Sequence, residues 1–428
     1  MLQQIESLGK TYHDRTKHSY LSVSIDPNYV DSSTQPSVYK RYPRFYRRFP
    51  LEPDNPVHSF IRHTSAISFR KSYRDGDYFL RVNPSAGALY PTEIYIQIRG
   101  IKGMIDGIYH LEIETECLTL IYELIDDGID SYLFENTLIN GLTFLIGCAY
   151  FRSSWKYKNR SVRYCFLDSG HHLGAIEASA IAHQRDIQIL FDFDKIGLNT
   201  DLGLENKEFI TACVIAGEGK EKSVRRLREK IPFVSATDYF EPNSFVEMGY
   251  RETTTNQTIP YKRIRSISPY TDLNLETILN RRSARCFRKG SISLADYQEI
   301  YRVLTASIPT ESEESIEIYS VIHRVDGLEM GLYRGEKLLQ AGDFGERAKY
   351  LCVNQAIARD SAVTFFFASR YENYQTAVQI AGYIGQRLYL ASRVLAIDCS
   401  GIGAYFDDET AEFLGTDRDI LYAMAIGR

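Results

Sequence analysis

Two arginines and a serine lie close enough in the sequence to hold a phosphate group. The segment Arg281–Phe287 reads RRSARCF, so Arg281, Ser283 and Arg285 stand at alternating positions. A guanidinium group donates two hydrogen bonds at once, and a serine hydroxyl adds another donor, which suits the oxygens of a phosphate. A basic helix end, favoured by the helix dipole, would explain the same residues without a ligand.

A run of small residues could lie against a flat ligand. Residues 83–91 read NPSAGALYP and stand shortly before an alternating, strand-like stretch that starts at Glu93. Small side chains allow a ligand to approach the backbone, whose amides can donate to its heteroatoms. The alternative is an ordinary tight turn that leads into the strand, and composition alone favours that alternative.

The adjacent residues Lys156 and Tyr157 could act together on a proton. An ammonium group near a phenol lowers the pKa of the phenol and makes it a usable proton acceptor. Neighbouring residues do not share one face of a helix, so a joint role requires a loop at this point. A charged surface segment is the alternative, because lysine and arginine are mostly exposed.

Two further groups give weaker indications. Asp168, His171 and His172 are three possible metal ligands within five residues. The favoured interpretation is instead a helix that starts at Asp168 as its N-cap, with packed histidines, so no metal is expected. Gly401 and Gly403 form a G-x-G pair, and no nucleotide-binding motif surrounds them. A G-x-G pair alone is weak evidence for a ligand site.

An internal repeat indicates which elements position these residues. Two strand-like stretches open with EIY at Glu93–Tyr95 and GIY at Gly107–Tyr109, and they recur at the same spacing as EIY at Glu317–Tyr319 and GLY at Gly331–Tyr333. Further matched pairs follow in the same order with slowly changing spacing, which a duplicated unit explains better than chance. Each copy is expected to contain a helix, a hairpin, a further strand, a long helix and an apolar closing strand.

This order of elements predicts an α+β fold with two related domains, each a mainly antiparallel sheet flanked by helices. The expected organisation is an N-terminal arm at 1–50, domain 1 at 51–233, a linker at 234–273 and domain 2 at 274–428. The linker is placed there because the segment is polar and irregular in composition.

Composition and charge exclude several classes of protein. The 428 residues hold 50 Lys and Arg against 55 Asp and Glu, a formal net charge of -5, so no basic excess favours a nucleic-acid partner. The 7 cysteines are scattered without a C-x-x-C pair, which fits neither a disulfide framework nor a zinc site. No secretory signal is recognised, and no apolar run reaches the ~20 residues of a membrane helix. A cytoplasmic protein without a membrane partner is expected.

Together the motifs resemble the nitroreductase superfamily, and within it the SagB/ThcOx-type branch that contains the azoline oxidases. NPSAGALYPTEIY is similar to the P-S-A-G-A-L-x-P-x-E-x-Y signature of that branch, and KYKNRSVRYCFLDSGH is similar to its K-Y-x-x-R-x-x-R-Y stretch with D-x-G-H. YHDRTKH and QPSVYKRYP look like its N-terminal region. The second copy resembles the superfamily more loosely, through RRSARCF and the ending GIGAYFDDETAEFLGTDRDILYAMAIG. The resemblance covers nearly the whole chain.

The resemblance implies FMN as the cofactor, with R-x-S-x-R of one domain on the phosphate and P-S-A-G of the other against the isoalloxazine. The first copy has FIRHTSAISF in place of R-R-S-x-R-x-F, and the second has no P-S-A-G before Glu317. We therefore expect a fused pseudo-dimer with one complete site and an empty second one. The residues expected on the phosphate are Arg281, Ser283 and Arg285, those on the ring are Pro84, Ser85, Ala86 and Gly87, and those near the ring or ribityl chain are Ser400, Gly401 and Gly403.

The resemblance also implies the reaction. Lys156 and Tyr157 are expected to abstract a proton while hydride passes to the flavin, so that a thiazoline or oxazoline of a peptide or amino-acid derivative becomes aromatic. Other enzymes of a biosynthetic complex are expected partners, and further homodimerisation is open. Two alternatives remain: an NAD(P)H-dependent nitro or quinone reductase on the same fold, and a non-catalytic, flavin-free scaffold subunit of a peptide-modifying complex.

Overall fold

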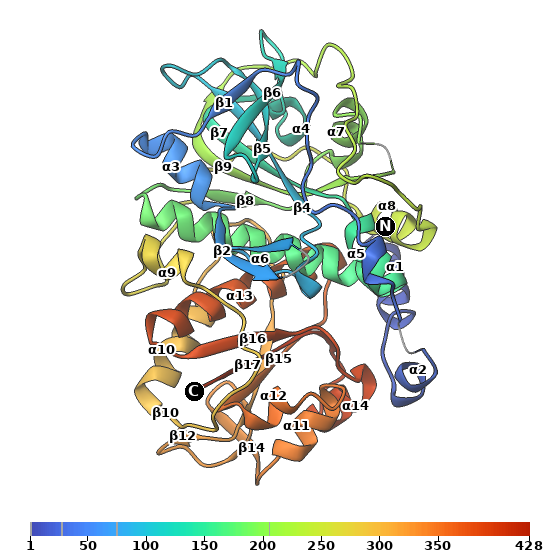
Figure 1. The fold of residues 1–428 in the computed structure, drawn as a ribbon, viewed down its shortest axis with the longest axis vertical. Coiled ribbons are helices and arrows are strands. Elements are labelled where there is room, and N and C mark those ends of the chain that lie inside the picture. The colour runs from blue at the N-terminus through green and yellow to red at the C-terminus, as the bar shows by residue number, and fades with distance from the viewer. Residues whose placement is uncertain (1, 27–28, 74–75, 205) are drawn as a thin grey trace. The chain divides into compact units, whose positions relative to one another are not determined.

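The computed structural model describes residues 2–26, 29–73, 76–204 and 206–428, and the chain divides into two compact units (Figure 1). We call Val30–Ser268 with Ile308–Ser312 the first-repeat unit, and Met1–Tyr29, Pro269–Ser307 and Glu313–Arg428 the second-repeat unit. The segment expected to be one arm at 1–50 is therefore shared between the units. Its part before Val30 belongs to the second-repeat unit and its remainder to the first.

The first-repeat unit is built on a seven-stranded antiparallel sheet with the strand order β1-β6-β5-β4-β7-β9-β8. Strand β4 pairs with β5 and β7, and all of its residues are buried. Helix α6 packs on β4, β7 and β9, and α7 contacts β9. The elements of the sheet are β1 (Arg48–Pro50), β4 (Thr92–Arg99), β5 (Gly107–Glu112), β6 (Cys117–Glu123), β7 (Thr137–Cys148), β8 (Gln188–Leu190) and β9 (Phe209–Glu221).

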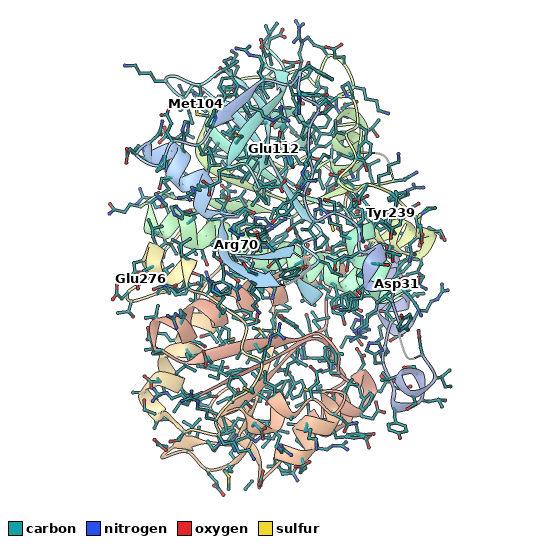
Figure 2. All side chains as sticks on the ribbon, viewed as in Figure 1. Asp31, Arg70, Met104, Glu112, Tyr239 and Glu276 are labelled. Atoms are coloured by element: carbon teal, nitrogen blue, oxygen red, sulfur yellow. The ribbon has the colours of Figure 1, made fainter. Side chains whose placement is uncertain are left out.

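Helices and a separate hairpin complete this unit. Side chains also link strands that are not adjacent in the sheet. Oε1 of Glu112 in β5, labelled in Figure 2, accepts a hydrogen bond of 3.0 Å from Nε of Arg48 in β1, across β6. The remaining elements are η1 (Ser32–Thr34), α3 (Pro56–His63), β2 (Ile67–Tyr73), β3 (Gly76–Arg81), η2 (Ala86–Ala88), α4 (Asp130–Leu133), α5 (Phe151–Tyr157), η3 (Lys158–Arg160), α6 (Ser161–Ala182), α7 (Lys195–Asp201) and α8 (Ser244–Thr253).

Two of these helices differ from the expectation. The segment expected to be an irregular linker contains α8, which Asn243 caps because its Oδ1 accepts from the backbone N of Phe245 and of Val246, both at 3.1 Å. Helix α6 begins at Ser161, so the expectation that a helix starts with Asp168 as its N-cap is wrong. Helix α6 is buried along nearly its whole length. A helix buried on all sides has no alternation of apolar and polar faces, so the sequence gives no amphipathic pattern from which its first residue could be located.

The second-repeat unit is built on a six-stranded antiparallel sheet with the order β14-β13-β11-β15-β17-β16. Helix α13 packs on β16 and β17. The elements are α1 (Leu2–Asp14), α2 (Tyr20–Ile25), α9 (Leu275–Leu279), β10 (Ile292–Ser293), α10 (Leu294–Thr305), β11 (Glu317–Ile322), β12 (Val325–Asp326), β13 (Gly331–Arg334), β14 (Lys337–Ala341), α11 (Gly345–Leu351), α12 (Ala356–Asp360), β15 (Val363–Ser369), α13 (Tyr374–Val394), β16 (Asp398–Ile402), α14 (Asp407–Leu414) and β17 (Asp419–Gly427).

The two sheets correspond strand by strand. The order β6-β5-β4-β7-β9-β8 of the first-repeat unit matches β14-β13-β11-β15-β17-β16 of the second, and the repeated EIY tripeptides open β11 and lie inside β4. The predicted fold class, a mainly antiparallel sheet flanked by helices in each of two units, is confirmed. Among the helices of the described ranges, none combines the length and the apolar character that crossing a membrane requires.

Candidate active site

The small-residue loop between β3 and β4 is fixed by a carboxylate from helix α6. The hydroxyl of Ser85 donates to Oδ2 of Asp168 at 2.5 Å, and the backbone N of Ala86 donates to Oδ1 at 3.2 Å. The same Ser85 hydroxyl accepts from the backbone N of Tyr90 at 2.9 Å. The loop therefore closes on itself through Ser85 and is anchored to the helix by one side chain.

Three residues of this loop have left-handed backbone conformations. Gly87 has φ 62°, Ala88 has φ 52° and Tyr90 has φ 46°. This conformation costs nothing at glycine but is unfavourable for alanine and tyrosine, so surrounding contacts must hold it. One such contact comes from β3, where the Tyr78 hydroxyl donates to the carbonyl of Ala88 at 3.0 Å. Strained backbone of this kind is concentrated at functional sites.

Lys156 and Tyr157 meet this loop at Gly87. A Cβ atom built on Gly87 would lie 2.7 Å from the Tyr157 hydroxyl and 3.3 Å from Lys156 Nζ. Lys156 and Tyr157 are the last two residues of helix α5 and do not lie in a loop, so the expectation of a loop at the pair is wrong. The helix breaks only after the pair, at Lys158, which has φ 48°. Both polar groups thus approach an exposed glycine that leaves room for them.

The environment of Tyr157 keeps its phenol protonated. Burial raises the pKa of Tyr157 well above its ordinary value, and the nearby Tyr164 and Asp168 raise it further. Lys156 Nζ lies over the Tyr157 ring, 5.5 Å from the ring centroid. The expected lowering of the phenol pKa by the ammonium group is therefore wrong for this arrangement, because the cost of burying a phenolate is the larger effect.

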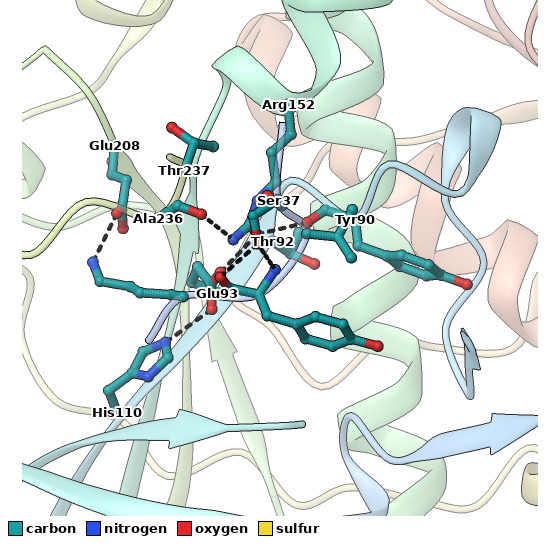
Figure 3. A network of polar contacts seen from close by, with 12 residues as sticks. Ser37, Tyr90, Thr92, Glu93, His110, Arg152, Glu208, Ala236 and Thr237 are labelled. Atoms are coloured by element: carbon teal, nitrogen blue, oxygen red, sulfur yellow. Dashed lines mark hydrogen bonds and ion pairs between the residues drawn. The ribbon is translucent and has the colours of Figure 1, made fainter. Parts of the chain in front are cut away.

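A buried network joins helix α5 to the end of the loop (Figure 3). Arg152, one turn before Lys156 on α5, is an ion-pair partner of Glu93 of β4 with Nη1 2.6 Å from Oε1. The same guanidinium donates to the backbone carbonyls of Tyr90 at 2.9 Å, Ser37 at 2.9 Å and Ala236 at 2.7 Å. Arg152 therefore holds the helix that carries Lys156 and Tyr157 against the loop that carries Gly87.

Glu93 also faces a second basic side chain. His110 Nε2 lies 2.8 Å from the second oxygen of Glu93. Burial alone would raise the pKa of Glu93, but Arg152 and His110 outweigh it and hold the pKa below the ordinary value. Beside it, Lys40 pairs with Glu208 at 2.7 Å and donates to the Tyr95 hydroxyl at 2.7 Å. The glutamate and the tyrosine of the PTEIY motif thus have structural roles.

Asp168 lies within α6 and is buried. Burial raises its pKa to about 7, although the hydrogen bonds from Ser85 and Ala86 act in the opposite direction. His172 is also buried and lies 2.9 Å from the Thr92 hydroxyl. Within the described residues, no group of three histidine, cysteine or carboxylate side chains is arranged to hold a metal ion.

Asp168→Asn is expected to flatten the pH dependence of stability. Between the unfolded pKa of ~3.9 and the folded value of about 7, the folded state keeps a proton that the unfolded state has lost. The free energy of unfolding of the parent protein therefore falls as pH rises through this window, by a few kcal/mol for this group. Urea unfolding at several pH values measures the slope. The exposed Asp54→Asn is the control, and an unchanged slope in Asp168→Asn would contradict the assignment.

In the second-repeat unit, three predicted ligand-binding residues contact one tyrosine of helix α13. The Ser283 hydroxyl lies 2.9 Å from the Tyr389 hydroxyl, and the backbone N of Gly401 donates to that hydroxyl at 2.7 Å. The Arg281 guanidinium lies over the Tyr389 ring, 5.0 Å from its centroid. The structure thus brings together Arg281, Ser283 and Gly401 through a residue that the sequence analysis did not single out.

The other predicted residues of this unit lie near that cluster. The backbone N of Ala284 donates to the carbonyl of Cys399 in β16 at 2.8 Å, which joins the RRSARCF segment to the strand that contains Ser400. Ser400 is buried, and Gly403 follows the end of β16. Arg285 is exposed.

Sequence reasoning missed Arg152, Tyr389 and the clamp made by Asp168. Arg152 follows a buried strand in a polar run, and Tyr389 is one of several tyrosines on a buried helix, so neither position carries a local signal. Asp168 was identified, but as a helix cap. Its clamp joins residues 83 positions apart, which no local pattern reveals.

Comparison with known proteins gives this fold a family context. The nitroreductase family model matches residues 278–428. A "putative nitroreductase" of Methanocaldococcus jannaschii is 31% identical over 94 residues, which span 21% of this chain and 46% of that protein; the match thus covers about half of this relative. The crystal structure of a "putative nitroreductase" from Anabaena variabilis aligns with 98% of this chain and 99% of its own, with a TM-score of 0.81 and 23% identity. The chain therefore has a nitroreductase fold throughout, and its family match lies in the copy expected to show the looser resemblance.

Proposed function

We propose that this protein is an FMN-dependent oxidoreductase that oxidises a thiazoline or oxazoline ring, in a peptide or a related amino-acid derivative, to the azole. The convergence of Lys156 Nζ and the Tyr157 hydroxyl on Gly87 carries the proposal. Forming the aromatic ring removes a proton as well as a hydride, so it needs a group that handles a proton beside the flavin. The nitroreductase family match at residues 278–428 supports the broader class of oxidoreductase.

The residues present fit FMN as the cofactor. Asn83, directly before the loop, is fully buried, and neither polar atom of its side chain has a hydrogen-bond partner among the described residues. A ligand with polar ring atoms would satisfy such an amide. Gly87 is exposed beside it, and the exposed Arg285 guanidinium is available to an anion. We assign Pro84, Ser85, Ala86 and Gly87 to the ring and Arg281, Ser283 and Arg285 to the phosphate.

The assignment of roles follows from the chemistry of the residues. When bound, FMN accepts a hydride, that is, two electrons and one hydrogen of the substrate ring. The second hydrogen leaves as a proton, which we assign to the Lys156 amine in its unprotonated form. The Tyr157 phenol, which burial keeps protonated, lies beside this amine as a hydrogen-bond donor. Turnover would require a two-electron acceptor from outside the chain; we propose dioxygen, which would leave as hydrogen peroxide.

The proposal extends to location and partners. The 7 cysteines, all within the described residues, are free thiols, as in proteins of a reducing compartment. We therefore propose a cytoplasmic protein that acts with other enzymes of natural-product biosynthesis on a peptide or amino-acid-derived substrate. Light scattering of the purified protein measures its molar mass and so tests whether the chain forms a further homodimer.

An absorption spectrum of the purified protein, with released flavin quantified against protein, tests the cofactor assignment. We expect one FMN per chain, because the sequence carries one R-x-S-x-R and one P-S-A-G segment. Two FMN per chain would contradict the loss of the second site. A colourless protein that cannot be reconstituted would favour the scaffold alternative. Rapid bleaching of the flavin by NAD(P)H would favour the reductase.

A further inference from the structure

Tyr389 of helix α13 touches three residues of the proposed cofactor site. Its side chain is only 3% exposed. Its hydroxyl contacts Ser283 and Gly401, and its ring lies under Arg281. We propose that Tyr389 is a positioning residue that turns the Ser283 hydroxyl and the Arg281 guanidinium toward the FMN phosphate. This inference rests on the proposed function, because it concerns the same cofactor.

The hydrogen bonds around Tyr389 set the direction of the Ser283 proton. The Tyr389 hydroxyl accepts from the backbone N of Gly401 at 2.7 Å, so it already acts as an acceptor there. A phenol is a stronger acid than a serine hydroxyl, so the phenol proton is the better donor in the 2.9 Å contact with Ser283. Ser283 Oγ is then the acceptor, and its own proton is free to donate to a phosphate oxygen.

Tyr389 remains a neutral donor under ordinary conditions. Burial raises its pKa to about 12, which outweighs the lowering effect of Arg281 and of its hydrogen bonds. A phenolate at this position would reverse the arrangement, because it could only accept and would draw the Ser283 proton inward. The neutral phenol is therefore the form that presents Ser283 as a donor to an anion.

The tyrosine ring also holds Arg281. The guanidinium carbon lies 5.0 Å from the ring centroid, within the range of a cation–π contact, and the side chain is only 3% exposed. The backbone around the pair is fixed as well: a Cβ on Gly401 would overlap the Tyr422 hydroxyl. The RRSARCF segment, Gly401 of β16 and Tyr389 are thus in mutual contact.

The test compares FMN with riboflavin, which lacks the phosphate. Flavin is removed, and the dissociation constant of each flavin is measured by the quenching of its fluorescence on binding. Tyr389→Phe keeps the ring and deletes the hydroxyl, so we expect the FMN dissociation constant to rise about tenfold, the loss of one oriented bond to a charged group. The riboflavin constant is expected to stay unchanged. Tyr383→Phe, another buried tyrosine of α13, is the matched control and should change neither.

A double-variant cycle separates orientation from packing. If Tyr389 acts through Ser283, then Tyr389→Phe should have little further effect on FMN binding once Ser283→Ala is present. An equal loss of FMN and riboflavin affinity, an unchanged FMN affinity, or full additivity with Ser283→Ala would each overturn the inference while leaving the cofactor assignment in place. Failure of the parent protein to bind either flavin would overturn the proposed function, and this inference with it.

Discussion

Lys156→Ala and Tyr157→Phe are each expected to lower the rate of azoline oxidation by about 10²–10⁴-fold while FMN stays bound. Both polar groups converge on Gly87, and neither belongs to the residues assigned to the phosphate. Loss of either group leaves the departing proton without its acceptor or without the hydrogen-bond partner of that acceptor. The substrate for the assay is a synthetic peptide that carries one thiazoline, and mass spectrometry follows the loss of two hydrogens.

The neighbouring Lys158→Ala provides the matched control for this experiment. Lys158 is exposed and directly follows the pair, so its replacement removes a positive charge from the same segment without removing a group that faces Gly87. Its rate should equal that of the parent protein. Full activity in both Lys156→Ala and Tyr157→Phe, with a normal flavin content, would refute the role of the pair. Loss of flavin in these variants would instead show that they act on cofactor binding.

The fold could be predicted from the sequence because its signals are repeated. Short tripeptides such as EIY at 93–95 and 317–319 recur in the same order, and both lie in corresponding strands, β4 and β11, of two sheets with matching strand order. The alternation of apolar residues and the antiparallel arrangement follow from local patterns. The extent of the units could not be predicted, because residues 1–29 join the second-repeat unit through contacts distant in sequence. One of these is the 2.9 Å contact between Lys17 and Asp408.

The candidate site was predictable only where motifs are local. Pro84 to Gly87 and the Lys156–Tyr157 pair were identified as separate motifs, and the structure brings them together at Gly87. The links that make the arrangement rigid join distant residues, as between Asp168 and Ser85 or Arg152 and Glu93. The start of α6 could not be found, because no side chain caps it. The pKa of Tyr157 depends on burial, which is a property of the folded chain.

Arg152→Met is expected to lower the free energy of unfolding of the first-repeat unit by about 3–5 kcal/mol. The side chain is fully buried, and its removal leaves the buried carboxylate of Glu93 without its arginine and three backbone carbonyls without a donor. Methionine fills much of the volume, so the loss of charge and hydrogen bonds dominates over the loss of packing. The single tryptophan, Trp155 on the same helix, reports the transition by its fluorescence during urea unfolding of the flavin-free protein.

The size of this effect depends on burial, and an exposed ion pair of the same unit shows why. Arg225 lies 3.1 Å from Asp126, but their side chains are 78% and 50% exposed, so water screens the pair and replaces it when it is broken. Arg225→Met should therefore change the unfolding transition very little. If Arg152→Met were equally mild, Glu93 would have to take up a proton or find another donor, and the network could not be what holds α5 against the loop. A severe effect of Arg152→Met, with only partial recovery in Arg152→Lys, would show that the forked geometry of the guanidinium matters. This geometry serves one carboxylate and three carbonyls at once, and it would then be what fixes Lys156 and Tyr157 beside Gly87.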